Sequence, residues 1–422
     1  MNAPEINPEQ ARALYTEREK RLYDTIALKT PDRVPIIYYS MFWHARNAGM
    51  TIKQSMYDYE ALSAAVRKIV VELQPDAFAP AHMTNALGPT MELMGYRQLK
   101  WPGNGTDDTQ TYQYIDGEYM KPSEYDEYIE DPSWFYMTKF LPRVADVYAP
   151  FASLPQYAGH QHLRLIHNMR MIRDPKIARG FERMARAGDE AERMFESAGR
   201  LHQELASLGF PLGQGVSSMA PYDYFADYMR GSKGAMLDMF RRKDKLLEAM
   251  DRSIPIISRV CGDAGQANPC KIVFFPMHWG LDGFMSLPQF KTFFWPQLRR
   301  VLMNMIDRGL IPMVLWEGDC TSRLETIADI PRGKAVYWFE RTDLARAKAV
   351  LGDTVCLRGN VPPSMLNMGT PDEVREYCRN LIKTVGKNGG LILDGGIGIP
   401  DEAKAENVRA MHASVREFGR YA

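Results

Sequence analysis

The chain has 422 residues, and its 52 lysines and arginines are balanced by 52 aspartates and glutamates. A balanced chain creates no overall field that would attract nucleic acid or an anionic membrane, so neither is expected as a partner. The sequence contains no window of about 18 uncharged apolar residues, so it predicts no membrane span.

The cysteines and the N-terminus bear on the compartment. Five cysteines form an odd, sparse set without a C-x-x-C pair, which is typical of a reducing cytoplasm rather than of a disulfide framework. The opening residues, M-N-A-P-E-I-N-P-E-Q, lack the basic segment and apolar core of a signal peptide. We therefore expect a cytoplasmic protein.

Strand and helix patterns alternate along the chain. Residues 8–29 show an amphipathic helical pattern before the first strand. Apolar and β-branched runs bounded by turn residues then predict eight strands, near residues 35, 77, 212, 273, 314, 336, 356 and 392. Each strand is followed by a helical pattern. Strand-then-helix order repeated eight times is typical of a (β/α)8 TIM barrel, so we expect an α/β fold in which residues 1–422 form one domain.

Two segments interrupt this repeat. Residues 96–120 combine W-P-G-N-G-T with the alternating run T-Q-T-Y-Q-Y-I-D-G-E-Y, which predicts a β-hairpin insertion with a turn at Asp116 and Gly117. Residues 125–205 are mostly helical, polar and of mixed charge, which predicts a helical insertion. We expect both to be parts of the barrel domain rather than separate domains.

Polar and aromatic residues gather where the predicted strands end, which is the edge that carries the active site in a TIM barrel. The buried run M-V-L-W at 313–316 ends on Glu317-Gly318-Asp319. Because strand side chains alternate faces, Glu317 and Asp319 are predicted to project the same way. Few polar groups among many aromatic ones are typical of a pocket for an aromatic small molecule. The expected substrate-binding residues are Trp43, His44, His82, Tyr222, Trp279 and Asn360.

The two carboxylates suit either metal binding or proton transfer. A catalytic zinc ion takes three protein ligands, and Glu317 or Asp319 with Cys356, plus Asp394 or His278, could meet that count from adjacent strand ends. General acid/base chemistry needs only a positioned carboxylate or histidine, and Glu317, Asp319 and His278 would serve as catalytic residues. Glu317 could instead pair with a nearby arginine, and Cys356 could be a small buried hydrophobe.

Several segments resemble the uroporphyrinogen decarboxylase superfamily, which also holds the corrinoid-dependent methyltransferases. They cover nearly the whole chain in order: P-D-R-V-P-I at 31–36, Y-D-E-Y-I-E-D-P at 125–132, R-G-S-K-G-A-M-L-D-M at 230–239, L-R-G-N-V-P-P-S-M-L at 357–366, G-T-P-D-E-V at 369–374, G-G-L-I-L-D-G-G-I-G-I-P at 389–400 and A-E-N-V at 405–408.

The resemblance is to the methyltransferase-like branch rather than to the decarboxylases. The decarboxylases carry an arginine-rich loop after the first strand, where this chain has Arg46 as its only cation, and a late histidine where it has Ile397. The methyltransferases bind zinc through a His-x-Cys pair and a late cysteine. Glu317-Gly318-Asp319 takes the place of the pair, and Gly396 lies near the late cysteine position. Similarity to aryl methyl ether demethylases with carboxylate and cysteine ligands implies Cys356 as the third ligand.

The resemblance implies O-demethylation. A methyl group would pass from a methylated small molecule, with an aryl methyl ether favoured by the aromatic strand ends, to a corrinoid (cobalamin) cofactor on a separate partner protein. Zn²⁺ or an acid would neutralise the phenolate leaving group. A homodimer is a further expectation.

Two other functions fit the same residues. A metal-free decarboxylase or lyase of an aromatic acid would use Arg46 or Arg358 to hold a carboxylate and would need no corrinoid protein. A non-catalytic barrel would bind its ligand tightly and form no product.

Overall fold

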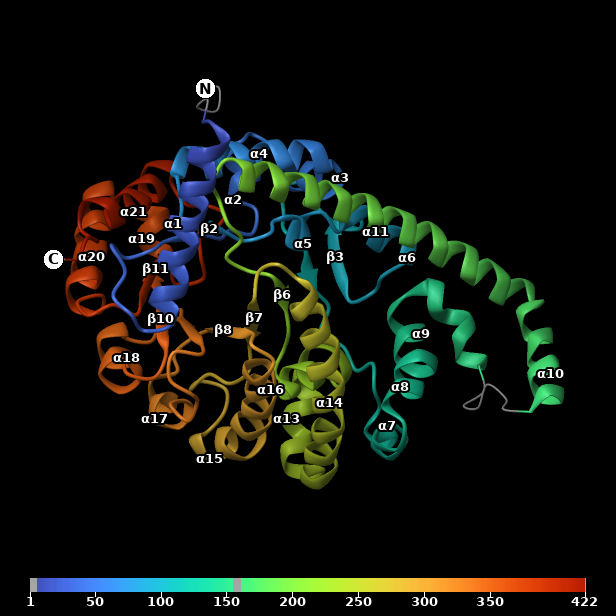
Figure 1. Ribbon diagram of the computed structural model, residues 1–422. Coiled ribbons are helices and arrows are strands. Elements are labelled where there is room, and N and C mark those ends of the chain that lie inside the picture. Colours follow the sequence, from blue (N-terminus) through green and yellow to red (C-terminus); the bar gives the residue numbers. More distant parts are fainter. Residues whose placement is uncertain (1–5, 155–160, 422) are drawn as a thin grey trace.

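A computed structural model describes residues 6–154 and 161–421, in which short parallel strands are surrounded by helices (Figure 1). One parallel sheet contains β6 (Val216–Ser217), β7 (Ile272–Met277), β8 (Ile311–Trp316), β9 (Val336–Phe339), β10 (Cys356–Val361) and β11 (Leu391–Gly395). A second parallel pair contains β1 (Ile37–Tyr38) and β2 (Ala77–Phe78).

Isolated parallel bridges join the two sheets at both sides. Ile36 pairs with Leu393 of β11, and Phe78 of β2 pairs with Leu212, a few residues before β6. The pairings therefore lead from each strand to the next and back to β1, which confirms the predicted α/β barrel. The third strand is split into the bridge at Leu212 and β6. Between them, Gly215 approaches the neighbouring backbone closely, since a Cβ atom there would lie 2.3 Å from the carbonyl oxygen of Cys270.

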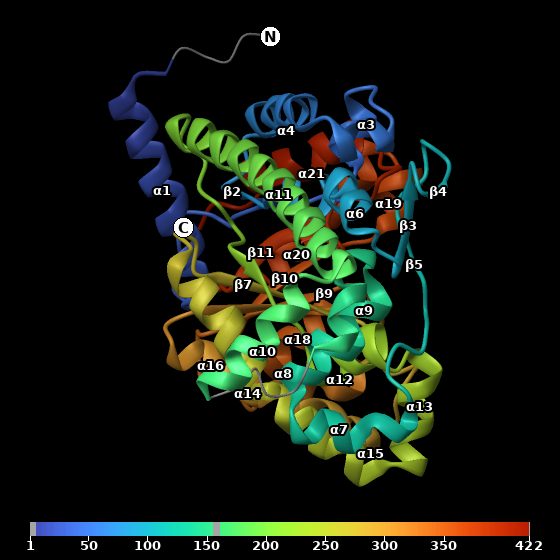
Figure 2. The same ribbon diagram turned by 90° about the vertical axis from the view of Figure 1, so that its right-hand side faces the viewer.

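Helices connect consecutive strands and cover the outside of the barrel (Figures 1 and 2). Those before the third strand are α2 (Trp43–Asn47), α3 (Ile52–Tyr57), α4 (Tyr59–Leu73), α5 (His82–Asn85) and α6 (Gly88–Met94). Those after it are α12 (Pro221–Asp223), η4 (Tyr224–Met229), α13 (Ser232–Arg241), α14 (Lys243–Ala267), α15 (Leu287–Gln289), η5 (Phe290–Phe294), α16 (Trp295–Asp307), η6 (Thr321–Arg323), α17 (Leu324–Ile327), α18 (Leu344–Leu351), α19 (Pro363–Met368), α20 (Pro371–Thr384) and α21 (Ala405–Glu417). Within the described ranges, no helix is both long enough and apolar enough to cross a membrane.

The two predicted insertions are present between β2 and β6. The first contains β3 (Leu99–Pro102), β4 (Gly105–Thr106) and β5 (Gln113–Tyr114), with β3 and β5 antiparallel. The second contains η1 (Pro122–Glu124), α7 (Tyr125–Glu130), α8 (Pro132–Phe135), η2 (Tyr136–Phe140), α9 (Leu141–Val144), η3 (Asp146–Ser153), α10 (His162–Ile172) and α11 (Pro175–Ser207). The predicted turn at Asp116 and Gly117 is wrong. The hairpin reverses between Pro102 and Gln113, and the Asp116 carboxylate accepts a hydrogen bond from the backbone N–H of Ser232 at 2.9 Å, which holds this stretch against α13.

The first helix, α1 (Pro8–Ile26), closes the barrel at the end where the strands begin. Its Leu22 and Ile26 cluster with inward-facing strand residues such as Met313 of β8 and Cys356 of β10. The alternate residues of the strands pack outward against the helices in a separate, larger core. Because α1 covers the end where the strands begin, we look for the site at the opposite end, where the strands finish.

Candidate active site at the barrel mouth

The inward-facing positions of two neighbouring strands lead directly to the site. Met313 and Leu315 of β8 point into the barrel, and the next position in that alternating series is Glu317. On β7 the series that contains Phe274 reaches His278 just past the strand end. Because β7 and β8 are paired in parallel, Glu317 and His278 meet at the mouth.

His278 lies between two carboxylates. Its Nδ1 is 2.7 Å from Oδ2 of Asp227, and its Nε2 is 3.7 Å from Oε1 of Glu317. The other oxygen of Asp227 accepts a hydrogen bond from Nε1 of Trp279 at 2.6 Å. Asp227 therefore fixes both the imidazole and the indole, and it leaves Nε2 of His278 directed to the side of Glu317.

The charges at this site favour a protonated His278. Burial lowers the pKa of His278, but the hydrogen bond to Asp227 and the charges of Asp223, Asp227 and Glu317 outweigh it and raise the pKa to about 9. The pKa of Glu317 is also raised, first by burial and then by repulsion from Glu340 and Asp227, although His278 opposes the shift. Near neutral pH the cluster therefore holds an imidazolium beside a carboxyl group that binds protons more readily than usual.

A second aspartate, Asp223, contacts the backbone of His278. Its Oδ2 accepts a hydrogen bond from the backbone N–H of His278 at 3.0 Å, while its buried Oδ1 has no partner in the described part of the chain. Burial raises the pKa of Asp223 to about 8. Asp223 and Asp227 are not among the residues predicted from the sequence. The signal was present in P-Y-D-Y-F-A-D at 221–227, which places two aspartates four residues apart on one helical face after the third strand.

The loop after β8 separates the two predicted carboxylates. Gly318 has a left-handed backbone (φ 73°), and its N–H donates to Oε2 of Glu340 at 2.6 Å. The strand alternation therefore ends at Glu317. Asp319 is exposed, and its Oδ1 accepts from the backbone N–H of Thr321 at 2.9 Å. Asp319 thus caps the following turn, η6.

The predicted zinc ligands are not brought together, and this corrects the expected metal set. Cys356 pairs with Val336, which pairs with Met313, so Cys356 lies in the layer that contacts α1. Glu317 is four residues beyond Met313, and four strand residues span about 13 Å. Among the described residues, no group of three or more His, Cys, Asp or Glu side chains is arranged to hold a metal ion. These residues do not fit a zinc site.

The predicted residues from the first two strand ends lie in the packed wall around the mouth. Trp43 is buried and donates from Nε1 to the carbonyl oxygen of Ala403 at 2.8 Å. His44 is buried, with Nε2 2.7 Å from Oδ1 of Asn85, and burial lowers its pKa to about 4. His82 is also buried, and burial likewise lowers its pKa to about 4. Both histidines are therefore neutral near pH 7.

The remaining predicted residues lie around the cluster and differ in how far their side chains are buried. Trp279 is half-buried, with its ring 4.6 Å from that of Phe284, and it joins the cluster through Asp227. Tyr222 is fully buried. Asn360 donates from Nδ2 to the carbonyl oxygen of Thr342 at 2.9 Å and so steadies a neighbouring loop.

The hairpin insertion adds aromatic residues at the mouth. Tyr112 contacts Phe42, with 5.8 Å between ring centroids, and Tyr114 follows it on β5. Tyr114 is exposed as a residue, and the pKa of its phenol is raised by partial desolvation and by the charges of Asp227 and Glu317. The insertion therefore places a phenol within electrostatic reach of both carboxylates.

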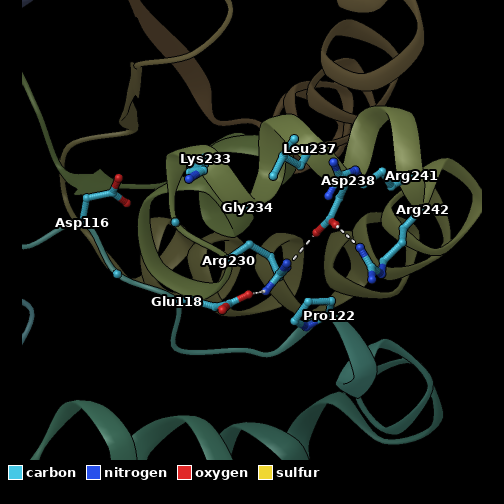
Figure 3. A pocket seen from close by; sticks show the side chains of 12 residues that line it. Asp116, Glu118, Pro122, Arg230, Lys233, Gly234, Leu237, Asp238, Arg241 and Arg242 are labelled. Carbon is cyan, nitrogen blue, oxygen red and sulfur yellow. Dashed lines mark hydrogen bonds and ion pairs between the residues drawn. The ribbon is translucent and has the colours of Figure 1, made fainter.

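A separate pocket of about 460 Å³ lies on the outside of the barrel (Figure 3). Its charged residues pair with one another: Arg230 donates to Asp238 at 2.7 Å and also to Glu118, and Arg242 lies 3.2 Å from Asp238. Asp238 is fully buried. These pairs tie α13 to the segment that follows the hairpin, so this part of the R-G-S-K-G-A-M-L-D-M stretch stabilises the fold.

The fold and the mouth together define an α/β-barrel enzyme with an acid–base cluster at the C-terminal ends of its strands. The family model for uroporphyrinogen decarboxylase (URO-D) matches residues 169–418, which is more than half of the chain. The chain belongs to the uroporphyrinogen decarboxylase family.

Individual relatives agree with this assignment over shorter regions. The chain is 33% identical over 110 residues to uroporphyrinogen decarboxylase of Chlorobium phaeovibrioides, covering 25% of this chain and 31% of that protein. It is 32% identical over 144 residues to the enzyme of Psychromonas ingrahamii, covering 33% and 39%. The chain thus spans well under half the length of these curated relatives. A solved methyltransferase from Methanosarcina mazei has the same fold, with a TM-score of 0.63, 16% identity, and coverage of 95% of this chain and 98% of that one.

Proposed function

We propose that this chain is a methyltransferase that moves a methyl group from an aryl methyl ether to a corrinoid cofactor carried by a separate protein. The observation that carries the proposal is the Asp227–His278–Glu317 cluster at the open end of the barrel. A methyl aryl ether is inert because a phenolate leaves poorly, so the enzyme must neutralise the charge that develops on the ether oxygen. A protonated imidazole at the mouth is suited to that task.

The donor of the proton is His278. Its Nδ1–H is held by Asp227, so its Nε2–H remains for the substrate oxygen, on the side of Glu317. As the O–CH₃ bond breaks, Nε2 transfers its proton to the ether oxygen, and the phenol leaves neutral. Glu317, as the carboxylate, stabilises the imidazolium before the transfer. Afterwards Glu317 takes up a proton from solvent, which its raised pKa favours, and passes it to the neutral imidazole. The reduced corrinoid supplies the nucleophile that accepts the methyl group.

The charge at the mouth favours this reaction over decarboxylation of a polycarboxylate. Asp227 and Glu340 lie close enough to Glu317 for their charges to raise its pKa. The two arginines that could hold a substrate carboxylate are engaged elsewhere. Arg358 is fully buried and donates to Asp394 at 2.8 Å, and Arg46 lies 3.5 Å from Glu402. A substrate with several carboxylates would meet net repulsion, whereas a neutral ether would not.

The aromatic neighbours support an aryl substrate. Trp279 is held next to the cluster, and Tyr114 and Tyr112 of the hairpin insertion border the same end of the barrel. Aromatic rings pair in offset or edge-to-face arrangements and add about 1 kcal/mol beyond the burial of apolar area. A planar methoxylated ring would gain such contacts.

The direct test is methyl transfer by the purified protein. Methoxylated aromatics such as methoxyphenols are incubated with the protein and reduced cobalamin, and the loss of the reduced cobalamin absorption is followed together with release of the phenol. We expect stoichiometric formation of both products. A phenol formed without cobalamin, or CO₂ released from an aromatic acid, would support the decarboxylase or lyase alternative instead.

A further inference from the structure

The hairpin insertion is hydrogen-bonded to η4, the helical segment at one side of the barrel mouth. The backbone N–H of Ile115 donates to the carbonyl oxygen of Gln98 at 2.9 Å, and Nε2 of Gln98 donates to the carbonyl oxygen of Tyr228 at 3.0 Å. Further on, the N–H of Met120 donates to the carbonyl oxygen of Met229 at 2.7 Å. Figure 2 shows the chain running from β5 toward α13. These bonds fix the insertion relative to η4.

Tyr114 lies within this anchored stretch and faces the mouth. The residue is 63% exposed, so its ring is open to a small molecule. The pKa of its phenol is nevertheless raised, first by desolvation and then by the charges of Asp227 and Glu317. Carboxylates shift the pKa of a phenol in this way only when they lie close to it. The phenol of Tyr114 therefore lines a concave surface beside the acid–base cluster.

A second tyrosine, Tyr228, supports the hydroxyl of Tyr114. Tyr228 directly follows Asp227 on η4 and is half-buried. Hydrogen bonding between the two hydroxyls raises the pKa of Tyr228 and opposes the rise in the pKa of Tyr114. Tyr228 is therefore the donor and Tyr114 the acceptor, because a donor resists losing its proton. A hydroxyl that accepts one hydrogen bond still has its own proton to donate, so Tyr114 can donate to a substrate.

A third phenol borders the same space from the barrel interior. Tyr39 follows β1 and is buried, with its ring edge-on to that of Trp338 at 5.2 Å between centroids. Burial raises the pKa of Tyr39 to about 12, and Glu317 and Tyr114 add to the shift although Arg358 opposes it. The space beside Glu317 thus has aromatic rings on the side of the barrel interior and on the side of the insertion. A flat ring suits such a space.

The charges beside Tyr114 decide which polar substituent a bound ring can carry there. A carboxylate would be repelled by Asp227 and Glu317, whereas a neutral hydroxyl can accept from Tyr114 without adding charge. We propose that Tyr114 selects methoxyphenols: its hydroxyl donates a hydrogen bond to the free hydroxyl of a ring whose ether oxygen lies at His278. This inference rests on the proposed methyl transfer and names the substrate class within it.

The preference among methyl donors tests this role with the purified protein and reduced cobalamin. The best of the three methoxyphenol isomers should have a kcat/KM at least about tenfold above that of methoxybenzene or of any methoxybenzoate, since a site that hydrogen-bonds a hydroxyl discriminates against analogues without it. Tyr114→Phe keeps the ring and removes the hydroxyl. The KM for the methoxyphenol should then rise about tenfold, with kcat and the kinetics of methoxybenzene unchanged. Tyr136→Phe removes an exposed hydroxyl on η2 and is the matched control.

Equilibrium binding separates this inference from the proposed function. Without cobalamin, titration calorimetry should give a Kd for the same methoxyphenol about tenfold higher in Tyr114→Phe than in the wild type, and equal values for methoxybenzene. If this difference is found but no methyl transfer occurs, the proposed function is wrong and the role of Tyr114 in binding phenols stands. Equal binding and equal donor preference in the two proteins, an equal loss with methoxybenzene, or a wild type that binds no methoxyphenol would overturn the role of Tyr114.

Discussion

At the scale of single residues, one contact defines the chemistry at the mouth: the hydrogen bond between His278 and Asp227. Without it, burial would leave His278 neutral, as it does for His44 and His82, whose pKa values fall to about 4. With it, the pKa of His278 rises to about 9. These three buried or half-buried histidines near strand ends therefore differ in charge because, of the three, His278 has a carboxylate hydrogen-bonded to its ring.

Replacing Glu317 tests the other side of the cluster. Glu317→Gln keeps the size and hydrogen-bonding shape but removes the charge and the proton, so we expect an intact fold and a loss of methyl transfer of about 100-fold or more. Glu325→Gln, on the exposed face of α17, is the control and should leave turnover unchanged. Turnover like that of the wild type in Glu317→Gln would show that Glu317 only shapes the loop.

Substitution of Asp319 is expected to affect the stability of the fold more than the rate of methyl transfer. The sequence predicts it as a second catalytic carboxylate, whereas its position suits a turn cap, a role that asparagine fills equally well. Asp319→Asn should therefore retain more than about a third of the wild-type rate, and Asp319→Ala should lower the melting temperature. A loss of activity as large as that of Glu317→Gln would restore the catalytic interpretation.

The pH dependence follows from His278. Its folded pKa of about 9 lies above the ordinary value of 6.5, so the protonated form and the stability that it contributes are fully present below pH 6.5 and are lost as the pH rises through 9. The rate of methyl transfer should fall over the same pH range, as His278 loses its proton. Asp227→Asn removes the charge that raises the pKa, so the fall should move to lower pH. If the pH dependence of the rate is unchanged in Asp227→Asn, His278 is not the proton donor in the rate-limiting step.

At the scale of elements, Arg323 organises the loop that carries His278 and Trp279. Its buried guanidinium donates to the carbonyl oxygens of Gly280 and Leu281 at 3.3 Å and stacks on Phe290 at 4.8 Å. These contacts join the loop after β7 to the turn after β8. The cluster is therefore held by the packing between two loops as well as by the strands.

Removing Arg323 should loosen both loops. Arg323→Ala leaves buried carbonyl groups without donors, and we expect a loss of about 3 kcal/mol in the free energy of unfolding. Arg299→Ala removes a partly exposed arginine that pairs with the exposed Asp329, and it should cost no more than about 0.5 kcal/mol. Denaturant unfolding of the two variants measures the contrast, and equal costs would contradict this role for Arg323.

Sequence patterns predicted the presence of the strands better than the residues at which the strands begin and end. The alternation of apolar residues located all eight strands, and His278 and Glu317 were found because they directly follow strands. Cys356 was misplaced because it was expected at the end of a strand, whereas β10 begins at Cys356 and runs to Val361. Asp223 and Asp227 were missed because they lie on a helical turn, and a rule based on strand ends does not reach them.

At the scale of the whole molecule, the barrel has a charged pair inside its apolar interior. Arg358 and Asp394 are both fully buried on neighbouring strands, and the guanidinium lies 3.7 Å from the centre of the Trp338 ring. Burial raises the pKa of Asp394 to about 6 even though Arg358 opposes the shift. The pair fixes the register of β10 and β11 below the mouth.

Removing one member of this pair should lower the free energy of unfolding strongly, and removing both members should lower it less. Arg358→Met leaves a buried carboxylate without its partner, so we expect a loss of about 3 to 5 kcal/mol. The double variant Arg358→Met/Asp394→Leu should recover a large part of that loss. Thermal unfolding of the single and double variants provides the comparison, and simple additivity of two losses would contradict the account.

The global fold was predictable because eight strand–helix units leave few alternatives, whereas the site depends on contacts between residues far apart in the sequence. Asp227 and His278 are 51 positions apart, and their distance is set by how η4 and the loop after β7 pack together.

The central claim is that the Asp227–His278–Glu317 cluster donates a proton during methyl transfer, and single-turnover kinetics with His278→Gln test it most directly. A methoxyphenol and an aryl methyl ether bearing a strongly electron-withdrawing ring are compared as methyl donors to reduced cobalamin. If His278 protonates the leaving group, the variant should lose about 100-fold or more with the methoxyphenol and far less with the activated ether, whose phenolate leaves without a proton. Equal losses with both donors, or no loss with either, would contradict the claim.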